Sequence, residues 1–76
     1  MMKEELLGRV SELVQQVTEA RFEGAVYAKL ARAHGYADGY MRALIDTGLV
    51  TREELLEAVS KARKDAVAAD DARRAA

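Results

Sequence analysis

The sequence contains no cysteine and no proline, and its aromatic residues are limited to one phenylalanine and three tyrosines. Without cysteine, the chain has neither a disulfide nor a thiolate ligand for a metal. Because proline kinks or breaks helices, its absence allows long uninterrupted helices. The net charge is only −1, from 12 basic and 13 acidic residues. This balance excludes a generally basic coat for nucleic acid and a polybasic membrane binder.

Long apolar runs are also missing, because no stretch approaches the about 18 residues that indicate a membrane span. The first residues, MMKEELLG, show no basic segment followed by an apolar one. We therefore expect no secretory signal and a cytoplasmic location. At 76 residues the chain is expected to form a single helical domain over positions 1–76. Its tail, AADDARRAA, has little to bury, so we expect fraying from about residue 68.

The composition favours helices, since alanine is the commonest residue and leucine, glutamate and arginine are abundant. These residues lose little side-chain freedom in a helix, and no window alternates apolar and polar residues as a strand does. We predict an all-α fold, a small bundle of three helices with a long first, a short middle and a long third helix. The Ala/Arg/Glu-rich composition is associated with a bacterial or phage origin.

The first predicted helix covers residues 3–34, because apolar and small residues recur there at alternating steps of four and three. So short a chain has little else to cover so long a stripe, which predicts a homodimer that completes the bundle. The alternative is a break between residues 20 and 24, since a glycine inside a helix costs about 1 kcal/mol. The predicted dimer interface consists of Leu6, Val10, Leu13, Val17, Ala20, Gly24 and Tyr27.

The other helix boundaries follow from capping signals. Gly35, after His34, is suited to end the first helix, and Gly48 to end a short middle helix over residues 37–46. Thr51 and Glu54 have the spacing of a capping box, so a third helix is predicted to start at Arg52. Val50 and Leu55 flank this box at the positions of a hydrophobic staple.

Signals for chemistry are weak, so we expect no enzyme activity, no cofactor, no metal and no small-molecule substrate. His34 is the only histidine, it has no cysteine partner, and its predicted place before Gly35 suits a structural role at a helix end. The Glu-x-x-His motif of a di-metal bundle is absent at its spacing. The acidic residues lie mostly three or four positions from basic ones, as on solvated helix faces.

The stretch YAKLARAHGYADGYMRALID resembles the helix-turn-helix pattern of bacterial and phage repressors. Ala31 and Gly35 match its small residue and its turn glycine, and Leu30, Tyr36, Met41 and Leu44 match its apolar positions. The resemblance implies a DNA-binding transcriptional regulator. However, Asp38 and Asp46 would lie on the face that meets phosphate, where lysine and arginine supply most affinity. Nucleic acid is therefore the alternative partner and not the expected one.

The favoured function is a non-enzymatic protein–protein interaction module that acts as a regulator, adaptor or inhibitor. A structural oligomerisation element is a further alternative. The predicted partner-binding site is the corner at Gly35, formed by Tyr36, Tyr40 and Arg42; the alternative is that the tyrosine rings are internal to the bundle. Tyrosine offers a large rigid surface with a polar tip, and arginine pairs carboxylates with two parallel hydrogen bonds.

Overall fold

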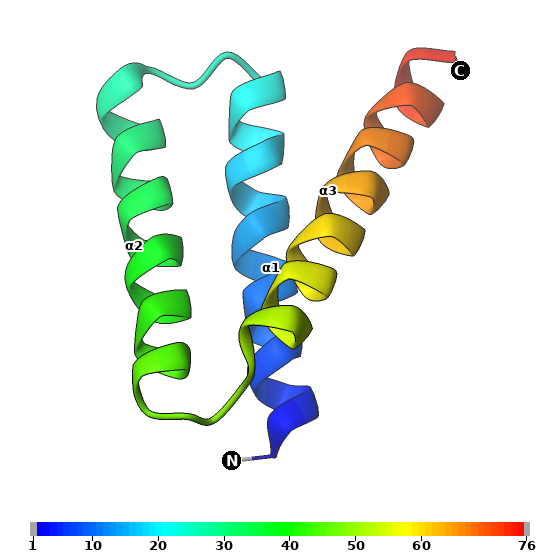
Figure 1. Ribbon diagram of the computed structural model, residues 1–76. Helices are drawn as coiled ribbons and strands as arrows, with labels where there is room; N and C mark the ends of the chain where they lie inside the picture. The colour runs from blue at the N-terminus through cyan, green and yellow to red at the C-terminus, as the bar shows by residue number, and fades with distance from the viewer. Residues whose placement is uncertain (1, 76) are drawn as a thin grey trace.

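The computed structural model describes residues 2–75, which form three α-helices joined by two short loops (Figure 1). Helix α1 spans Lys3–Phe22, α2 spans Tyr27–Asp46 and α3 spans Arg52–Ala75. α1 and α2 run antiparallel, while α3 crosses α1 obliquely and diverges from α2 toward its C-terminus (Figure 1). α1 packs against both other helices, most extensively against α3, whereas α2 and α3 barely touch. The prediction of an all-α bundle of three helices is thus confirmed.

The hydrophobic core follows α1 in two clusters. The first joins all three helices and contains Leu6, Val10, Val14, Leu44, Val50, Leu55 and Ala62. The second lies between α1 and α2 and contains Leu13, Val17 and Ala37. In the middle of α3, the buried residues are Ala62 and Ala66. Their small side chains allow the backbone of α3 to lie close to α1.

The first helix ends at Phe22, so the prediction of one helix over residues 3–34 is wrong and the alternative break is correct. Gly24 has φ of 72°, a left-handed conformation that favours glycine. The Gly24 N–H donates to the carbonyl of Arg21 at 3.1 Å, and the Ala25 N–H donates to the carbonyl of Ala20 at 2.9 Å. These two bonds form a Schellman motif, which satisfies carbonyls at the end of α1.

The predicted helix end at Gly35 is wrong as well, because α2 continues unbroken from residue 27 to residue 46. The middle helix is therefore not short, and the corner required for a helix-turn-helix does not exist. Gly35 and Gly39 are exposed, and a Cβ at either position would meet open space. The opposite side of α2 packs on the core through a stripe that continues past both glycines: Leu30, Ala33, Ala37, Tyr40, Met41 and Leu44. Burial of this stripe outweighs the about 1 kcal/mol that each glycine costs.

The stripe predicted to form a dimer interface is covered within one chain. Leu6, Val10, Leu13 and Val17 are buried in the two core clusters. The other three residues leave the core at the end of α1, since Ala20 is half-buried, Gly24 is exposed and Tyr27 is 85% exposed. The turn at Gly24 folds α2 back onto α1, so this stripe is not available to a second copy.

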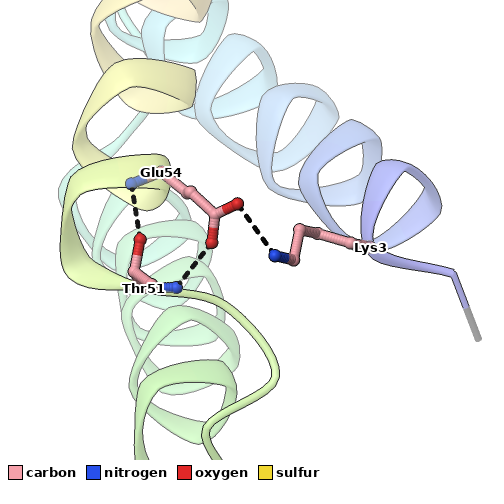
Figure 2. Close-up of polar contacts among 3 residues, drawn as sticks. All are labelled: Lys3, Thr51 and Glu54. Atoms are coloured by element: carbon pink, nitrogen blue, oxygen red, sulfur yellow. Dashed lines mark hydrogen bonds and ion pairs between the residues drawn. The ribbon is translucent and has the colours of Figure 1, made fainter.

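The end of α2 and the start of α3 agree with the sequence prediction. Gly48 has φ of 74° and follows the C-cap residue Thr47. The Thr51 Oγ1 accepts a hydrogen bond from the Glu54 N–H at 3.1 Å, and the Glu54 carboxylate accepts one from the Thr51 N–H at 2.9 Å (Figure 2). Val50 and Leu55 are buried in the same cluster, which completes the staple. α3 then continues to Ala75, and fraying from about residue 68 stays a prediction.

The same carboxylate ties the start of α3 to the start of α1. The Lys3 Nζ lies 3.0 Å from the second oxygen of Glu54 (Figure 2). The hydrogen bond from the Thr51 backbone and the ion pair with Lys3 lower the pKa of Glu54. This contact lies at the surface, so it orients the chain ends more than it stabilises the fold.

Candidate functional site

A groove lies between α2 and α3, lined by side chains of both helices and of α1; the two helices diverge here over α1 (Figure 1). Its upper part, toward the α1–α2 loop, is lined by Val14, Val17, Thr18, Arg21, His34, Ala37, Asp38, Met41, Val59 and Arg63. Its lower part shares Asp38 and Met41 and is also lined by Gly39, Arg42, Ile45, Asp46, Arg52 and Leu55. We refer to both parts together as the α2/α3 groove. Its floor is apolar and its rim is charged.

The volume of the groove changes along its length. The upper part holds about 50 Å³, and the lower part widens to about 580 Å³ while it remains open to solvent. Pockets for small molecules usually have about 300–1,000 Å³ and enclose most of the ligand. The upper part is too small for such a ligand. An elongated groove with a narrow and a wide end is better suited to side chains that project from one face of a helix.

The lining of the groove arises from helical spacing on both sides. Residues 34, 38, 41 and 45 recur at steps of four and three, so they form the edge of α2 that faces α3. Tyr27 precedes His34 by seven residues and extends this edge upward as an 85% exposed ring. On α3, Val67 follows Arg63 by one turn and is 44% exposed. The groove is thus bordered by exposed apolar surface beyond its upper end.

His34 is fixed by a hydrogen bond across the end of the groove. The Arg21 guanidinium donates to the Nε2 of His34 at 2.9 Å, which joins the last turn of α1 to α2. A guanidinium group can only donate, so Nε2 of His34 is the acceptor in this bond. The predicted role of His34 at a helix end is wrong, since α2 continues for twelve residues beyond it. Its ring instead forms part of the groove wall.

Positive charge predominates on the rim of the groove, where four arginines (Arg21, Arg42, Arg52 and Arg63) stand against Asp38 and Asp46. The four arginines and two aspartates together give the groove a net charge of +2. Among residues 2–75, the ion pairs are formed by other bases: Lys3, Arg9, Lys61, Arg73 and Arg74. Arg21 shares its guanidinium with His34, whereas Arg42, Arg52 and Arg63 form none of these ion pairs and can bind a carboxylate from outside the chain.

The three residues predicted to bind a partner at the Gly35 corner do not share one face. Tyr40 is half-buried and packs against both core clusters. Tyr36 is 58% exposed and lies beside Arg9 on the side of α2 away from α3. A hydrogen bond to the Tyr36 side chain is the main cause that raises the pKa of Arg9, and Glu12 adds to it. Only Arg42 lines the α2/α3 groove.

Sequence reasoning missed the groove because it placed a helix end at Gly35. That boundary separated His34 from Asp38 and Met41, which lie on one edge of α2. The recurrence of residues 27, 34, 38, 41 and 45 at helical steps is the signal that could have found this edge. The position of this edge opposite Arg63 of α3 depends on how the two helices pack. The spacing of residues within one helix therefore does not indicate it.

The described part of the chain lacks the features of a metal site and of a membrane span. Within residues 2–75, no three histidine, aspartate or glutamate side chains lie close enough to hold a metal ion. No helix of this region combines the length and the apolarity needed to cross a membrane. In comparisons with known proteins, no protein-family model, no curated protein and no solved structure matches this chain.

Proposed function

We propose that this protein is a non-enzymatic interaction module that binds a helix of a partner protein in the α2/α3 groove. Bound in this way, it would act as a regulator, adaptor or inhibitor. The occupant is an amphipathic helix with an apolar face and acidic flanks. The observation that carries the proposal is the combination of an apolar floor with rim arginines that form no ion pair among residues 2–75.

Each part of this helix has a counterpart in the groove. Met41 and Val59 offer apolar surface to side chains spaced at three and four residues, as in other helix-in-groove complexes. Arg21 and Arg63 border the upper part, and Arg42 and Arg52 border the lower part. Guanidinium groups bind carboxylates with two parallel hydrogen bonds, so acidic flanks complement both rims.

A second copy of the chain is a poorer occupant. The apolar faces of its own α1 and α2 are buried in its core. The exposed end of α3 offers Val67 and alanines, and its Asp70 is already bound to Arg73 and Arg74. The alternative of DNA binding is less well supported, because the helix-turn-helix motif needs a turn at Gly35 and α2 has none there. An acidic helix from a partner protein can bind in the groove without a rearrangement of this chain.

The proposal can be tested with a displayed library of helical peptides of about 18 residues. Such a helix spans about 27 Å, close to the length of α2. The library has leucines on one face and randomised polar or charged flanks. Selection on the unmodified protein is expected to enrich acidic flanks, and the binding should weaken as salt rises.

Two charge reversals on neighbouring residues of α3 provide the control. Arg63→Glu lies in the groove, whereas Lys64→Glu makes the same change of charge outside it. Arg63→Glu should weaken the selected peptides by about tenfold or more, equal to about 1.4 kcal/mol, and Lys64→Glu should leave their affinity unchanged. Enrichment of basic or neutral flanks, failure to enrich any peptide, or equal loss in both variants would refute the proposal. Sedimentation of the peptide-free protein as a dimer through this groove would also refute it.

A further inference from the structure

The charges along the α2/α3 groove alternate in sign. The upper end carries Arg21 and Arg63, the middle carries Asp38, and the lower part carries Arg42 and Arg52, with Asp46 one helical turn beyond Arg42. From the upper end as far as Arg42, the order is thus positive, negative, positive. Asp38 is the one charged side chain that lines both parts, so it marks the boundary between them. Among residues 2–75, the ion pairs do not include Asp38, although Arg42 follows it by one helical turn.

We infer that this positive–negative–positive order selects a partner helix with an acid, a base and an acid in register along its flank. The inference rests on the proposed function and specifies which acidic helix the groove prefers. A uniformly acidic helix would place a carboxylate against Asp38 in the middle of the groove. A base at that position instead pairs with Asp38, while the acids on either side pair with the two arginine ends.

The spacing of the partner charges follows from the helices that line the groove. His34 contacts Arg21 and so marks the level of the upper arginines on α2; from His34 to Arg42 is eight residues, or about 12 Å along the axis. From Arg52 to Arg63 is eleven residues on α3, or about 16 Å. Asp38 lies midway between residues 34 and 42. Two acids about eight residues apart with a base midway between them, Glu-x₃-Lys-x₃-Glu, match the shorter of these lengths and stay on one side of a helix.

This pattern is the same in both chain directions, because the base is central and the acids are symmetric. The prediction therefore holds for a partner helix that runs parallel or antiparallel to α2. Like charges placed against each other suppress binding of wrong partners and so add to the specificity that attraction provides. In the groove, Asp38 is the element that rejects a helix with an unbroken acidic flank.

The test uses three peptides with one common leucine face and different central flanks: Glu-x₃-Lys-x₃-Glu, Glu-x₃-Gln-x₃-Glu and Lys-x₃-Glu-x₃-Lys. Circular dichroism of each free peptide gives its helix content, so affinities can be corrected for it. Fluorescence anisotropy with the unmodified protein should show the first peptide binding about fivefold more tightly than the second, equal to about 1 kcal/mol, the upper end of the range for an exposed ion pair. The third should bind most weakly.

Two aspartate variants locate the preference. Asp38→Asn should abolish the difference between the first and second peptides while leaving the affinity for the second unchanged or higher. Asp71→Asn removes the same charge on the exposed side of α3, outside the groove, and should preserve the difference. If the second peptide binds and Arg63→Glu releases it, but the central lysine gives no advantage, the inference is overturned and the proposed function stands. If none of the three peptides binds, the proposed function itself fails.

Discussion

Replacing each of two glycines with alanine should change stability in opposite directions, because the structure gives them opposite roles. Gly24 ends α1 with φ of 72°, whereas Gly35 lies inside α2 with open space around its missing side chain. A prediction from local signals alone assigns the turn to Gly35 and a helix interior to Gly24. The two substitutions therefore distinguish a chain that turns at Gly24 from one that turns at Gly35.

The magnitudes follow from the backbone conformation. At Gly35, alanine has the higher helix propensity by about 0.8–1.0 kcal/mol and meets no steric obstacle, so Gly35→Ala should stabilise by up to about 1 kcal/mol. At Gly24, a left-handed alanine costs about 1–2 kcal/mol, offset by about 0.4–1 kcal/mol from a less flexible unfolded chain. Gly24→Ala should therefore destabilise by about 1 kcal/mol. The two variants should differ by about 2 kcal/mol.

Thermal unfolding followed by circular dichroism measures this difference directly. For a domain of this size, 1 kcal/mol shifts Tm by about 4–8 °C, so Gly35→Ala should melt above and Gly24→Ala below the unmodified protein by that amount. Gly39→Ala and Gly48→Ala serve as matched controls, expected to follow Gly35 and Gly24 respectively. A higher Tm for Gly24→Ala than for Gly35→Ala would show that the chain turns at residue 35.

Three further predictions concern the cap and the tyrosines. Thr51→Ala should lower the free energy of unfolding by about 1 kcal/mol in a urea titration, and Thr51→Gly by less, because the Oγ1 caps α3. The lowered pKa of Glu54 means that its ionised form is favoured by folding, so its contribution is present above the unfolded pKa and is lost as pH falls through the folded pKa. Glu54→Gln should thus reduce the acid dependence of stability, measured as Tm against pH between neutral and acidic buffers. Tyr40→Ala should cost about 3 kcal/mol as a core truncation, whereas Tyr36→Ala should change stability by less than about 0.5 kcal/mol in the same titration.

The helix boundaries predicted correctly are those set by residues close together in the sequence, which start or end a helix by themselves. Thr51 and Glu54 satisfy each other within one turn, and Gly48 ends α2 without help from distant residues. Such caps act locally, so their residues can be identified without knowing how the helices pack. The same holds for the all-α class, which follows from composition and periodicity.

The path between Gly24 and Gly35 could not be decided locally. Either glycine is suited to end a helix, and either costs about 1 kcal/mol inside one. The spacing that runs through Gly24 consists largely of Ala20, Tyr27 and Ala31, which bury little in the structure. The spacing through Gly35 includes Leu30, Met41 and Leu44, which pack on α1. The larger burial decides the path, and that burial depends on α1 being present as a separate helix.

The groove was beyond local prediction for a related reason, since it depends on the direction of α3 relative to α2. Closing the gap between the two helices would take Arg21, Asp38 and Arg63 out of water. Removing an ion from water costs several kcal/mol unless a partner charge is held in good geometry, and among residues 2–75 no ion pair joins these three. These charges favour a separation of α2 from α3, while the small side chains of Ala62 and Ala66 let α3 lie close to α1. In the proposed complex, a partner helix that brings its own carboxylates and one base would cover the apolar floor without leaving those charges unpaired. The polar residues that disfavour closure of the bundle would then also select the partner.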